Sequence, residues 1–342
     1  MKNILIIIAL FTLNFVLFSC ETIVDDIPLS RFPEIKEKLV LTSFISPQDT
    51  TIYVKVTISS PLFGTYKTQN SGYYVANGDT IRYGGNDNNI TNAIVTLSSD
   101  NQTITLPYQS KNRLYAISAK AFKIEAGKTY TLKATTKDYA VEASTTIPLE
   151  NVKIDNYTAT PVLRLITYYS SNQVGQQRDT LNGYEVQFSW KDVAQQNNFY
   201  KIGAEIEFNL EIPVFKNNAI SYQASKGTYN ANWYDEQIYP TDANQDGAVI
   251  NSQKADIFNY FTVKSTFNGK TYKSRPSALG SKLTLQIANL SKEFYDYQLS
   301  LFKFQDSQDN PFAEPAPVFS NIKNGLGCFA GYNRSEKVVV LP

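Results

Sequence analysis

The segment from Asp242 to Gly247 has the residue types and spacing that most directly suggest metal chemistry. Its sequence is Asp-Ala-Asn-Gln-Asp-Gly, so side-chain oxygens recur at every second position and a glycine follows the last of them. Oxygens of Asp242, Asn244 and Asp246 can converge on a hard cation such as calcium, because the glycine permits a sharp turn. The carboxylate expected six residues after the glycine is absent, since that position is Gln253. The alternative is a polar turn stabilised by its own Asn and Asp side chains.

Cys20 is a second candidate for chemistry, because it ends an apolar run over residues 4–18. That run is shorter than the ~20 apolar residues that a membrane-spanning helix needs. It follows the single basic residue Lys2, which is typical of an export signal. The four residues LFSC that end at Cys20 resemble a lipobox, in which the signal is cleaved before the cysteine and the sulfur carries a diacylglycerol. The sequence therefore predicts cleavage after Ser19 and a lipid on Cys20; an ordinary secretory signal with an incidental cysteine is the alternative.

The residues that follow Cys20 bear on the location of the anchored protein. Acyl chains on this cysteine would hold the protein at a bilayer, since each buried CH2 contributes ~0.8 kcal/mol. Glu21 stands where an inner-membrane retention signal has Asp, so delivery to the outer membrane is favoured. The acidic residues Glu21, Asp25 and Asp26 also resemble the surface-export signals of Bacteroidota lipoproteins. We therefore expect a lipid-anchored outer-membrane protein at the cell surface; the periplasmic face is the alternative.

The composition excludes several functional classes. The chain has no histidine, which removes Ser-His-Asp triads and His-ligated zinc or haem sites. Lys2 belongs to the predicted signal, so the 31 remaining basic side chains balance the 31 acidic ones, and the absence of a basic block argues against nucleic acid as a partner. Lipidation of Cys20 would leave Cys328 without a partner for a disulfide bond. The 23 Tyr and 20 Phe, with many Thr, Ile and Val, favour β-sheets.

Alternating apolar and polar residues predict β-strands along most of the chain, and so an all-β fold that positions these candidate sites. The segment DTTIYVKVTIS, for example, alternates between one buried and one solvated face. Short strands separated by turn signals predict an immunoglobulin- or fibronectin-like β-sandwich over residues 38–149. Within AGKTYTLKAT, Tyr130 occupies the position of a tyrosine corner, in which the hydroxyl bonds back to the preceding backbone.

The rest of the chain predicts a second β-rich, sandwich-like domain over residues 150–342. It contains a hairpin around Asn268-Gly269, the strongest short hairpin dipeptide. Near the C-terminus the apolar residues change to helical spacing, which predicts one helix over about 291–305 with Ser291 as its N-cap. Residues 1–19 are predicted to be a lipoprotein signal peptide and residues 20–37 a lipidated tether.

Three Asp-Thr pairs, each followed by Thr, Ile or Leu, resemble the O-glycosylation motif of exported Bacteroidota proteins, in which the threonine carries the sugar. The threonines are Thr50, Thr80 and Thr180. Each lies in a segment that we predict to be a turn or loop, where a bulky sugar can be accommodated. About one such match is expected from ordinary composition, so incidental matches are the alternative.

The segment TYNANWYDEQIYP is rich in aromatic residues and includes Trp233, Tyr234 and Tyr239. Exposed rings this close together can stack on sugars or anchor a protein interface. The three residues are therefore a candidate binding site. The alternative, which we favour, is that these rings close one end of the sandwich core.

Several segments together carry a resemblance to a known family. They are KLVLTSFISPQDT, SSPLFG, AGKTYTLKAT, FNGKTY, LSKEFYDYQLSL and, most specifically, NPFAEPAPVFSNIKNGLGCFAGYN. With the lipobox, they make the sequence similar over most of its length to the Bacteroidota outer-membrane lipoproteins of the domain of unknown function 4249 (DUF4249). Cys328 lies where an aliphatic residue is expected, so we predict that it is a buried small apolar residue. Relatives tend to be encoded beside TonB-dependent transporters, and the resemblance therefore implies an accessory role at such a transporter. It implies no catalytic residues.

Three hypotheses about function follow. The first is a non-enzymatic accessory or binding subunit of a TonB-dependent outer-membrane transporter, and the second is a stand-alone surface glycan-binding or adhesive module. The third is a hydrolase that uses two Asp or Glu carboxyl groups about 5–9.5 Å apart, a separation that sequence does not reveal. Apart from the candidate calcium site the sequence predicts no cofactor, and it does not indicate the ligand.

Overall fold

The computed structural model describes residues 36–59, 72–76, 79–83, 88–100, 102–169, 176–216, 219–233, 235–259, 264–308, 314 and 316–341. The predicted signal peptide, the lipidation site Cys20 and almost all of the tether therefore lie outside the described residues, as does Tyr234. Apart from Lys36 and Glu37, the described residues belong to one compact unit. None of the helices in this part of the chain is long and apolar enough to cross a membrane.

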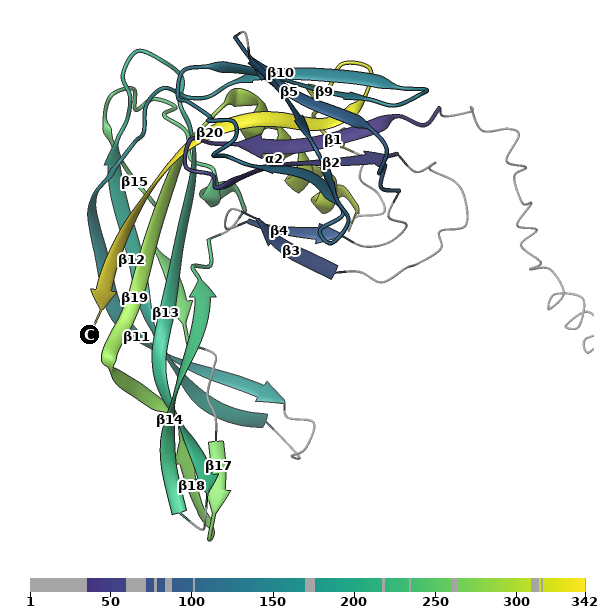
Figure 1. Ribbon diagram of the computed structural model, residues 1–342. Helices are drawn as coiled ribbons and strands as arrows, with labels where there is room; N and C mark the ends of the chain where they lie inside the picture. Colours follow the sequence, from purple (N-terminus) through teal and green to yellow (C-terminus); the bar gives the residue numbers. More distant parts are fainter. Residues whose placement is uncertain are drawn as a thin grey trace, which may run out of the picture. The chain divides into compact units, whose positions relative to one another are not determined.

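The predicted all-β class is confirmed, because strands make up most of the described residues and only one α-helix accompanies them (Figure 1). The largest sheet has eight strands in the order β14-β13-β19-β20-β1-β2-β8-β7. In that order their bounds are Ala219–Asn230, Phe199–Lys216, Arg275–Leu290, Leu326–Leu341, Leu39–Ile45, Thr51–Ile58, Leu114–Ser118 and Tyr108–Gln109.

Two four-stranded sheets and two hairpins complete the strands. One sheet has the order β10-β9-β5-β6; in the other, β12 pairs with β11 on one side and with β15 and β16 on the other. The first comprises Ala140–Thr146, Thr129–Thr135, Ile94–Ser99 and Gln102–Leu106, in that order. The second comprises β11 (Ile154–Tyr169), β12 (Gln176–Lys191), β15 (Val249–Asn251) and β16 (Ala255–Phe258). The hairpins are β3 (Gly72–Ala76) with β4 (Asp79–Tyr83), and β17 (Lys264–Phe267) with β18 (Lys270–Lys273).

Two hydrophobic cores of the sandwich type lie between these sheets. In the first, side chains such as Leu41, Leu97 and Leu132 pack between the β1–β2 part of the large sheet and the sheet that contains β5, β9 and β10. In the second, Ile206, Leu285 and others pack between the β13–β19 part of the large sheet and the sheet of β12. Strict alternation of buried residues along the strands creates these faces. The sandwich-like prediction is thus confirmed, whereas the boundary at residue 149 stays a prediction.

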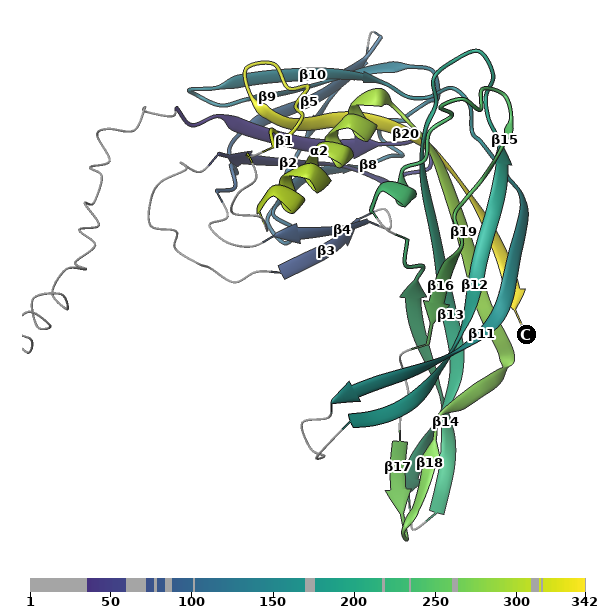
Figure 2. The ribbon, with the colours of Figure 1, turned by 180° about the vertical axis from the view of Figure 1, so that it is seen from behind.

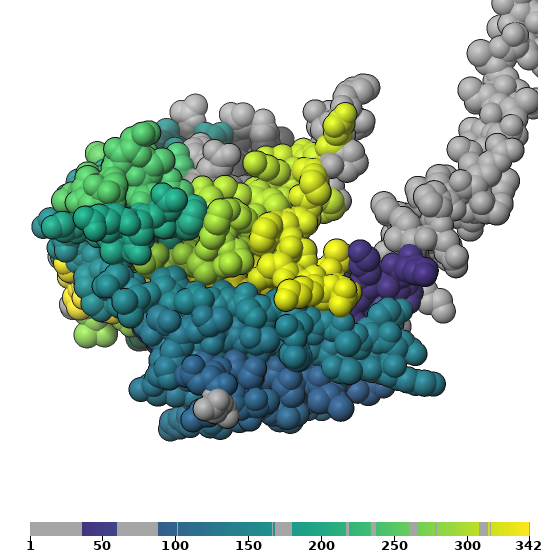
Figure 3. Space-filling view, turned by 90° about the horizontal axis from the view of Figure 1, so that it is seen from above, coloured from purple at the N-terminus to yellow at the C-terminus, as the bar shows by residue number. Residues whose placement is uncertain are grey.

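The last strand, β20, links the two cores. Its first half pairs in parallel with β1, from Val40 opposite Leu326 to Ile45 opposite Gly331, and its second half pairs with β19. The segment before β20 also touches β10, since the Lys323 amide donates to the Glu142 carbonyl at 2.8 Å. Figure 3 shows this C-terminal segment, in yellow, beside the teal residues around β9 and β10. One strand therefore contributes to both sandwich cores.

Tyr130 bonds to the backbone as its sequence position predicts. Its hydroxyl accepts a hydrogen bond from the Glu125 amide at 2.7 Å and donates to the Lys123 carbonyl at 3.4 Å. The ring is buried and contacts Phe122 with a centroid separation of 6.0 Å. The contact fixes the turn before β9 against the first core.

The predicted helix is present as α2, Lys292–Gln308 (Figure 2). Its apolar face packs against the large sheet, where the Phe294 ring lies 4.5 Å from that of Phe44. Cys328 is fully buried under this helix, as predicted, and burial raises the pKa of its thiol. Ser291 occupies the predicted N-cap position, directly before the helix, and its carbonyl accepts the Tyr295 amide at 3.3 Å. Its hydroxyl, however, accepts a bond from the Gly331 amide of β20 instead of from an amide in the first turn of the helix.

Candidate functional site

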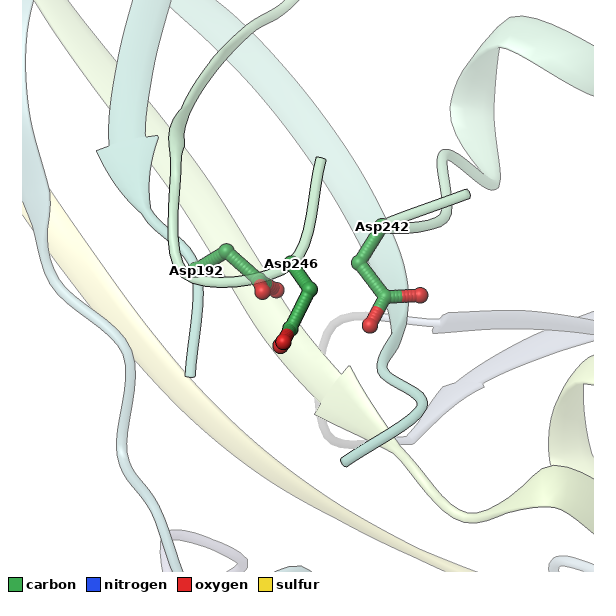
Figure 4. A group of neighbouring side chains, drawn as sticks. All are labelled: Asp192, Asp242 and Asp246. Carbon is green, nitrogen blue, oxygen red and sulfur yellow. The ribbon is translucent and has the colours of Figure 1, made fainter. Parts of the chain in front are cut away.

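Three aspartates from two loops meet beside the second core. Asp192 directly follows β12, whereas Asp242 and Asp246 belong to the segment that precedes β15. One carboxylate oxygen from each lies within 4.8 Å of the others, and Figure 4 shows the three side chains next to one another. We call Asp192, Asp242 and Asp246 the aspartate cluster.

The local backbone brings the two loops together. Asn244 and Gly247 adopt left-handed conformations, with φ of 62° and 68°, and the Gln245 amide donates to the Asp242 carbonyl at 2.7 Å. A Cβ at position 247 would lie 2.9 Å from the Cβ of Ala194 in the facing loop. Glycine is therefore required at this position both for its φ and for the close approach.

Asp192 is the most enclosed member of the cluster, with 4% of its surface exposed. Its Oδ1 accepts hydrogen bonds from the Tyr200 hydroxyl at 2.6 Å and from the Asn198 side-chain amide at 3.2 Å. Its Oδ2 accepts from the Gly247 backbone amide at 2.8 Å. Burial, together with the bond to Asp192, raises the pKa of the Tyr200 phenol, so this hydroxyl remains a donor. Asp192 thus links β13 and both loops.

The other two carboxylates bond across the same gap. Asp242 is also buried, and its Oδ2 accepts from the Asn198 backbone amide at 3.0 Å. Asp246 is exposed, and its Oδ1 accepts from the Gln195 backbone amide at 2.7 Å. Within the described part of the chain, Lys and Arg side chains form no ion pair with these aspartates. Neutral hydrogen-bond donors, the backbone amides with Tyr200 and Asn198, therefore stabilise the three negative charges, and the mutual repulsion of the carboxylates remains.

The structure supports part of the sequence prediction for this site. It brings Asp242 and Asp246 together, while Asn244 is exposed at the turn between them. Gln253 follows β15, and its carbonyl accepts the indole N–H of Trp233 at 2.9 Å. Asp192 was missed, because it lies fifty residues upstream in the sequence. The only local signal for it is an acidic residue directly after a strongly alternating strand.

The cluster has the donor set that a hard cation prefers. Calcium takes six to eight oxygen ligands. A carboxylate can coordinate the cation with one of its lone pairs while another lone pair accepts an N–H hydrogen bond. Hydrogen bonds engage Oδ2 of Asp242 and Oδ1 of Asp246, which leaves one oxygen of each without a bond to a described residue. The three aspartates would hold the ion, with the remaining positions supplied by backbone oxygens or water.

We expect calcium, but not magnesium, to raise the melting temperature of the protein, because calcium relieves carboxylate repulsion and tolerates irregular geometry. At a hundredfold excess over the dissociation constant the gain in unfolding free energy is ~2.7 kcal/mol. Differential scanning calorimetry with and without chelator measures it. Asp246→Asn, which alters an exposed residue, should remove this increase in melting temperature. If calcium does not change the melting temperature of the parent chain, the segment is a polar turn and not a calcium site.

The predicted glycosylation sites occupy different surroundings. Thr50 is exposed in the turn before β2, as expected. The loop prediction is wrong for Thr80, which lies in β4, and for Thr180, which lies in β12. Both strands run through polar segments, and a polar composition is more typical of loops, so the sequence did not indicate these strands. The Thr180 side chain is exposed; that of Thr80 lies outside the described side chains.

The aromatic binding prediction is not supported for two of its three residues. Trp233 is 6% exposed and Tyr239 is 7% exposed, so neither forms an exposed platform. The Trp233 ring contacts Phe188 at a centroid distance of 6.1 Å, and that of Tyr239 contacts Phe302 at 5.7 Å. Both rings fill the interior, as the alternative interpretation predicts. Tyr234 is outside the described residues.

A cleft of about 430 Å³ lies between the β11–β12 strands and the β13–β19 strands. Its size is within the usual range for small-ligand sites. Apolar and aromatic side chains alternate with amides and hydroxyls along its walls. They are Pro161, Val162, Leu163, Thr180, Asn182, Gly183, Tyr184, Phe208, Asn209, Leu210, Asn259, Ser274, Arg275, Pro276 and Ser281. No sequence pattern identified this cleft, since its residues come from four strands and their connections.

The fold and these sites define an all-β protein that combines two sandwich-type cores with a loop-borne aspartate cluster. The family model described as "Domain of unknown function (DUF4249)" matches residues 24–338, and the chain therefore belongs to this family. The resemblance to DUF4249 noted in the sequence is thus confirmed, whereas its Bacteroidota and lipoprotein part stays a prediction. Comparisons with curated proteins and with solved structures produced no match.

Proposed function

We propose that this protein is an outer-membrane lipoprotein that acts as a non-enzymatic accessory or binding subunit of a TonB-dependent transporter. The observation that carries the proposal is the LFSC motif at Cys20, followed by an acidic segment. A lipid at this position would hold the protein in the plane of its partner. Membership of the DUF4249 family is consistent with this role but assigns no activity.

The predicted lipid anchor lies outside the strands that form the two cores. The described strands begin only at Leu39, so cleavage after Ser19 and lipidation of Cys20 would leave the two cores intact. Confinement by a lipid raises the effective concentration of a partner in the same membrane, so a modest interface is sufficient for association. A binding role therefore needs no unusually large contact surface.

Exposed apolar residues support a binding rather than a catalytic role. Leu163 and Leu165 on β11 are 73% and 65% exposed, and Val340 at the end of β20 is 71% exposed. Leu163 also lines the cleft. Leu163 and Leu165 lie two residues apart and so share one face of β11, and exposed apolar neighbours of this kind often mark interaction sites.

Purification of the tagged, lipidated chain from detergent-solubilised outer membranes tests the proposed partnership. We expect a TonB-dependent transporter to co-purify in stoichiometric amounts. A matched double variant, Leu163→Ser with Leu165→Ser, should reduce the recovered transporter, whereas Val249→Ser, at a residue 54% exposed elsewhere, should not. Recovery of the folded, lipidated protein without a transporter would contradict the proposal.

A stand-alone glycan-binding or adhesive module is the second candidate function, and the cleft is the observation that favours it. Sugars present many hydroxyl groups, and the cleft offers polar side chains to bond them, among them those of Asn182, Thr180 and Ser274. Glycan binding by the purified chain without a transporter would favour this candidate over the first.

A further inference from the structure

The hairpin formed by β13 and β14 closes where Lys216 pairs with Ala219. A second hairpin, β17–β18, meets it at this end, as Figures 1 and 2 show at the lower end of these strands. Phe215 joins the two: its ring stacks on Phe267 at a centroid distance of 5.2 Å and meets Tyr272 edge-on at 6.3 Å. We call residues 211–216, 219–226 and 264–275 the basic tip.

The basic tip has a charge that differs sharply from that of the whole chain. It contains the single acidic residue Glu211, and its six basic residues give it a formal charge of +5, which falls to +4 when Glu207, the ion-pair partner of Lys226 just outside these bounds, is included. The six are Lys216, Lys226, Lys264, Lys270, Lys273 and Arg275. The chain as a whole has 32 basic and 31 acidic residues, so this concentration of positive charge is local.

Part of this charge has no acidic neighbour. Lys226 pairs with Glu207 at 2.7 Å. Arg275 bonds to Glu211 at 2.6 Å and stacks over the Tyr222 ring at 4.0 Å. Lys216 and Lys270 are exposed and form no ion pair with a described residue; the Lys270 ammonium lies 5.5 Å from the centre of the Tyr272 ring. These lysines are available to an anionic partner at no cost in broken ion pairs.

The residue types favour a lipid surface over a protein as that partner. Five of the six basic residues are lysines, which act as point charges and are depleted in the cores of protein interfaces. Phosphate headgroups in a fluid bilayer can approach such charges from any direction. The Phe215 ring, next to Lys216 in the sequence and 37% exposed, supplies the apolar element that partitions into the membrane interface.

We propose that the basic tip binds the phosphate groups of anionic lipids and so forms a second membrane contact, besides any lipid on Cys20. The contact is electrostatic, with the aromatic ring of Phe215 entering the headgroup region. It depends on the side chains of the tip alone and does not rest on the transporter partnership.

Flotation with lipid vesicles tests the proposal on the chain that begins at Glu21, which lacks the apolar leader and Cys20 but retains all the described strands. We expect binding to phosphatidylcholine vesicles that contain phosphatidylglycerol, little binding to phosphatidylcholine alone, and loss of binding in high salt. Each lysine near an anionic surface contributes roughly fivefold in affinity, so Lys216→Gln with Lys270→Gln should weaken binding roughly 25-fold. The matched control is Lys111→Gln with Lys137→Gln, two exposed lysines outside the tip.

A fluorescent variant gives an independent measurement. Phe215→Trp places an indole at the tip, while the native Trp190 and Trp233 are buried and should not respond to vesicles. We expect a blue shift of its emission on addition of anionic vesicles. Equal binding to both vesicle types, or equal loss in the control pair, would overturn the proposal. So would a tip variant that binds vesicles normally but loses affinity for polyglutamate, because the tip would then recognise acidic polypeptides.

Discussion

Replacement of Cys20 by alanine is expected to give a soluble or unprocessed protein that carries no acyl chains. The sulfur of Cys20 is the predicted site of the diacylglycerol, and each buried CH2 contributes ~0.8 kcal/mol, so the two chains together supply on the order of 20 kcal/mol of anchoring free energy. No other side chain of the protein can supply an anchoring free energy of this size. Fractionation of cells, with mass spectrometry of the N-terminal peptide, measures both the location and the acylation.

Cys328→Ala is the matched control, since it removes the other cysteine of the chain. Cys328 is fully buried beneath α2, and this variant should remain acylated and membrane-bound. Washing the membranes at about 1 M salt, where the Debye length is ~3 Å, separates the acyl anchor from the electrostatic contact of the basic tip. A Cys20→Ala protein that still carried acyl chains would refute the lipobox interpretation.

Asp192→Ala is expected to lower the free energy of unfolding by about 3–5 kcal/mol, because it removes the shared acceptor of two buried and one partly buried hydrogen bonds and leaves donors unsatisfied. These donors are the Tyr200 hydroxyl, the Asn198 side-chain amide and the Gly247 backbone amide. Urea denaturation, performed in the presence of a chelator, measures the hydrogen-bond contribution without any contribution from calcium.

Asp246→Ala provides the comparison for this experiment. Asp246 is exposed and accepts one backbone bond, from Gln195, so its replacement should cost less than about 1 kcal/mol. Equal destabilisation by the two variants would mean that the buried network around Asp192 does not hold the loops together. A loss for Asp192→Ala below about 1 kcal/mol would lead to the same conclusion.

Local features of the fold were predictable from the sequence because neighbouring residues determine them. The alternation in β1 and β13 reflects the two faces of a strand, and it specifies which residues are buried. Asn268 and Gly269 adopt the positive φ values, 49° and 72°, that a tight hairpin requires. The Tyr130 hydroxyl reaches only a few residues back along the chain. In each case the determining interaction spans a short stretch of sequence.

Aromatic residues show where such local reasoning stops. A cluster of Trp and Tyr is compatible with an exposed platform or with a core, and only the sheets around Trp233 and Tyr239 decide for the core. The same holds for Ser291, whose hydroxyl could cap α2 but bonds to Gly331 of β20. Distant strands compete with local partners, and the sequence near the residue does not record that competition.

The sequence by itself determined the class of fold, the helix near the C-terminus, the family resemblance and two of the three aspartates of the cluster. Tertiary structure alone decided that β1 pairs in parallel with β20, some 286 residues away at Val40 and Leu326, and that Asp192 completes the cluster. It also gathered the cleft and the basic tip from separate strands. The physical reason is that periodicity and turn chemistry act over a few residues, whereas these sites depend on how sheets pack and which strands become neighbours.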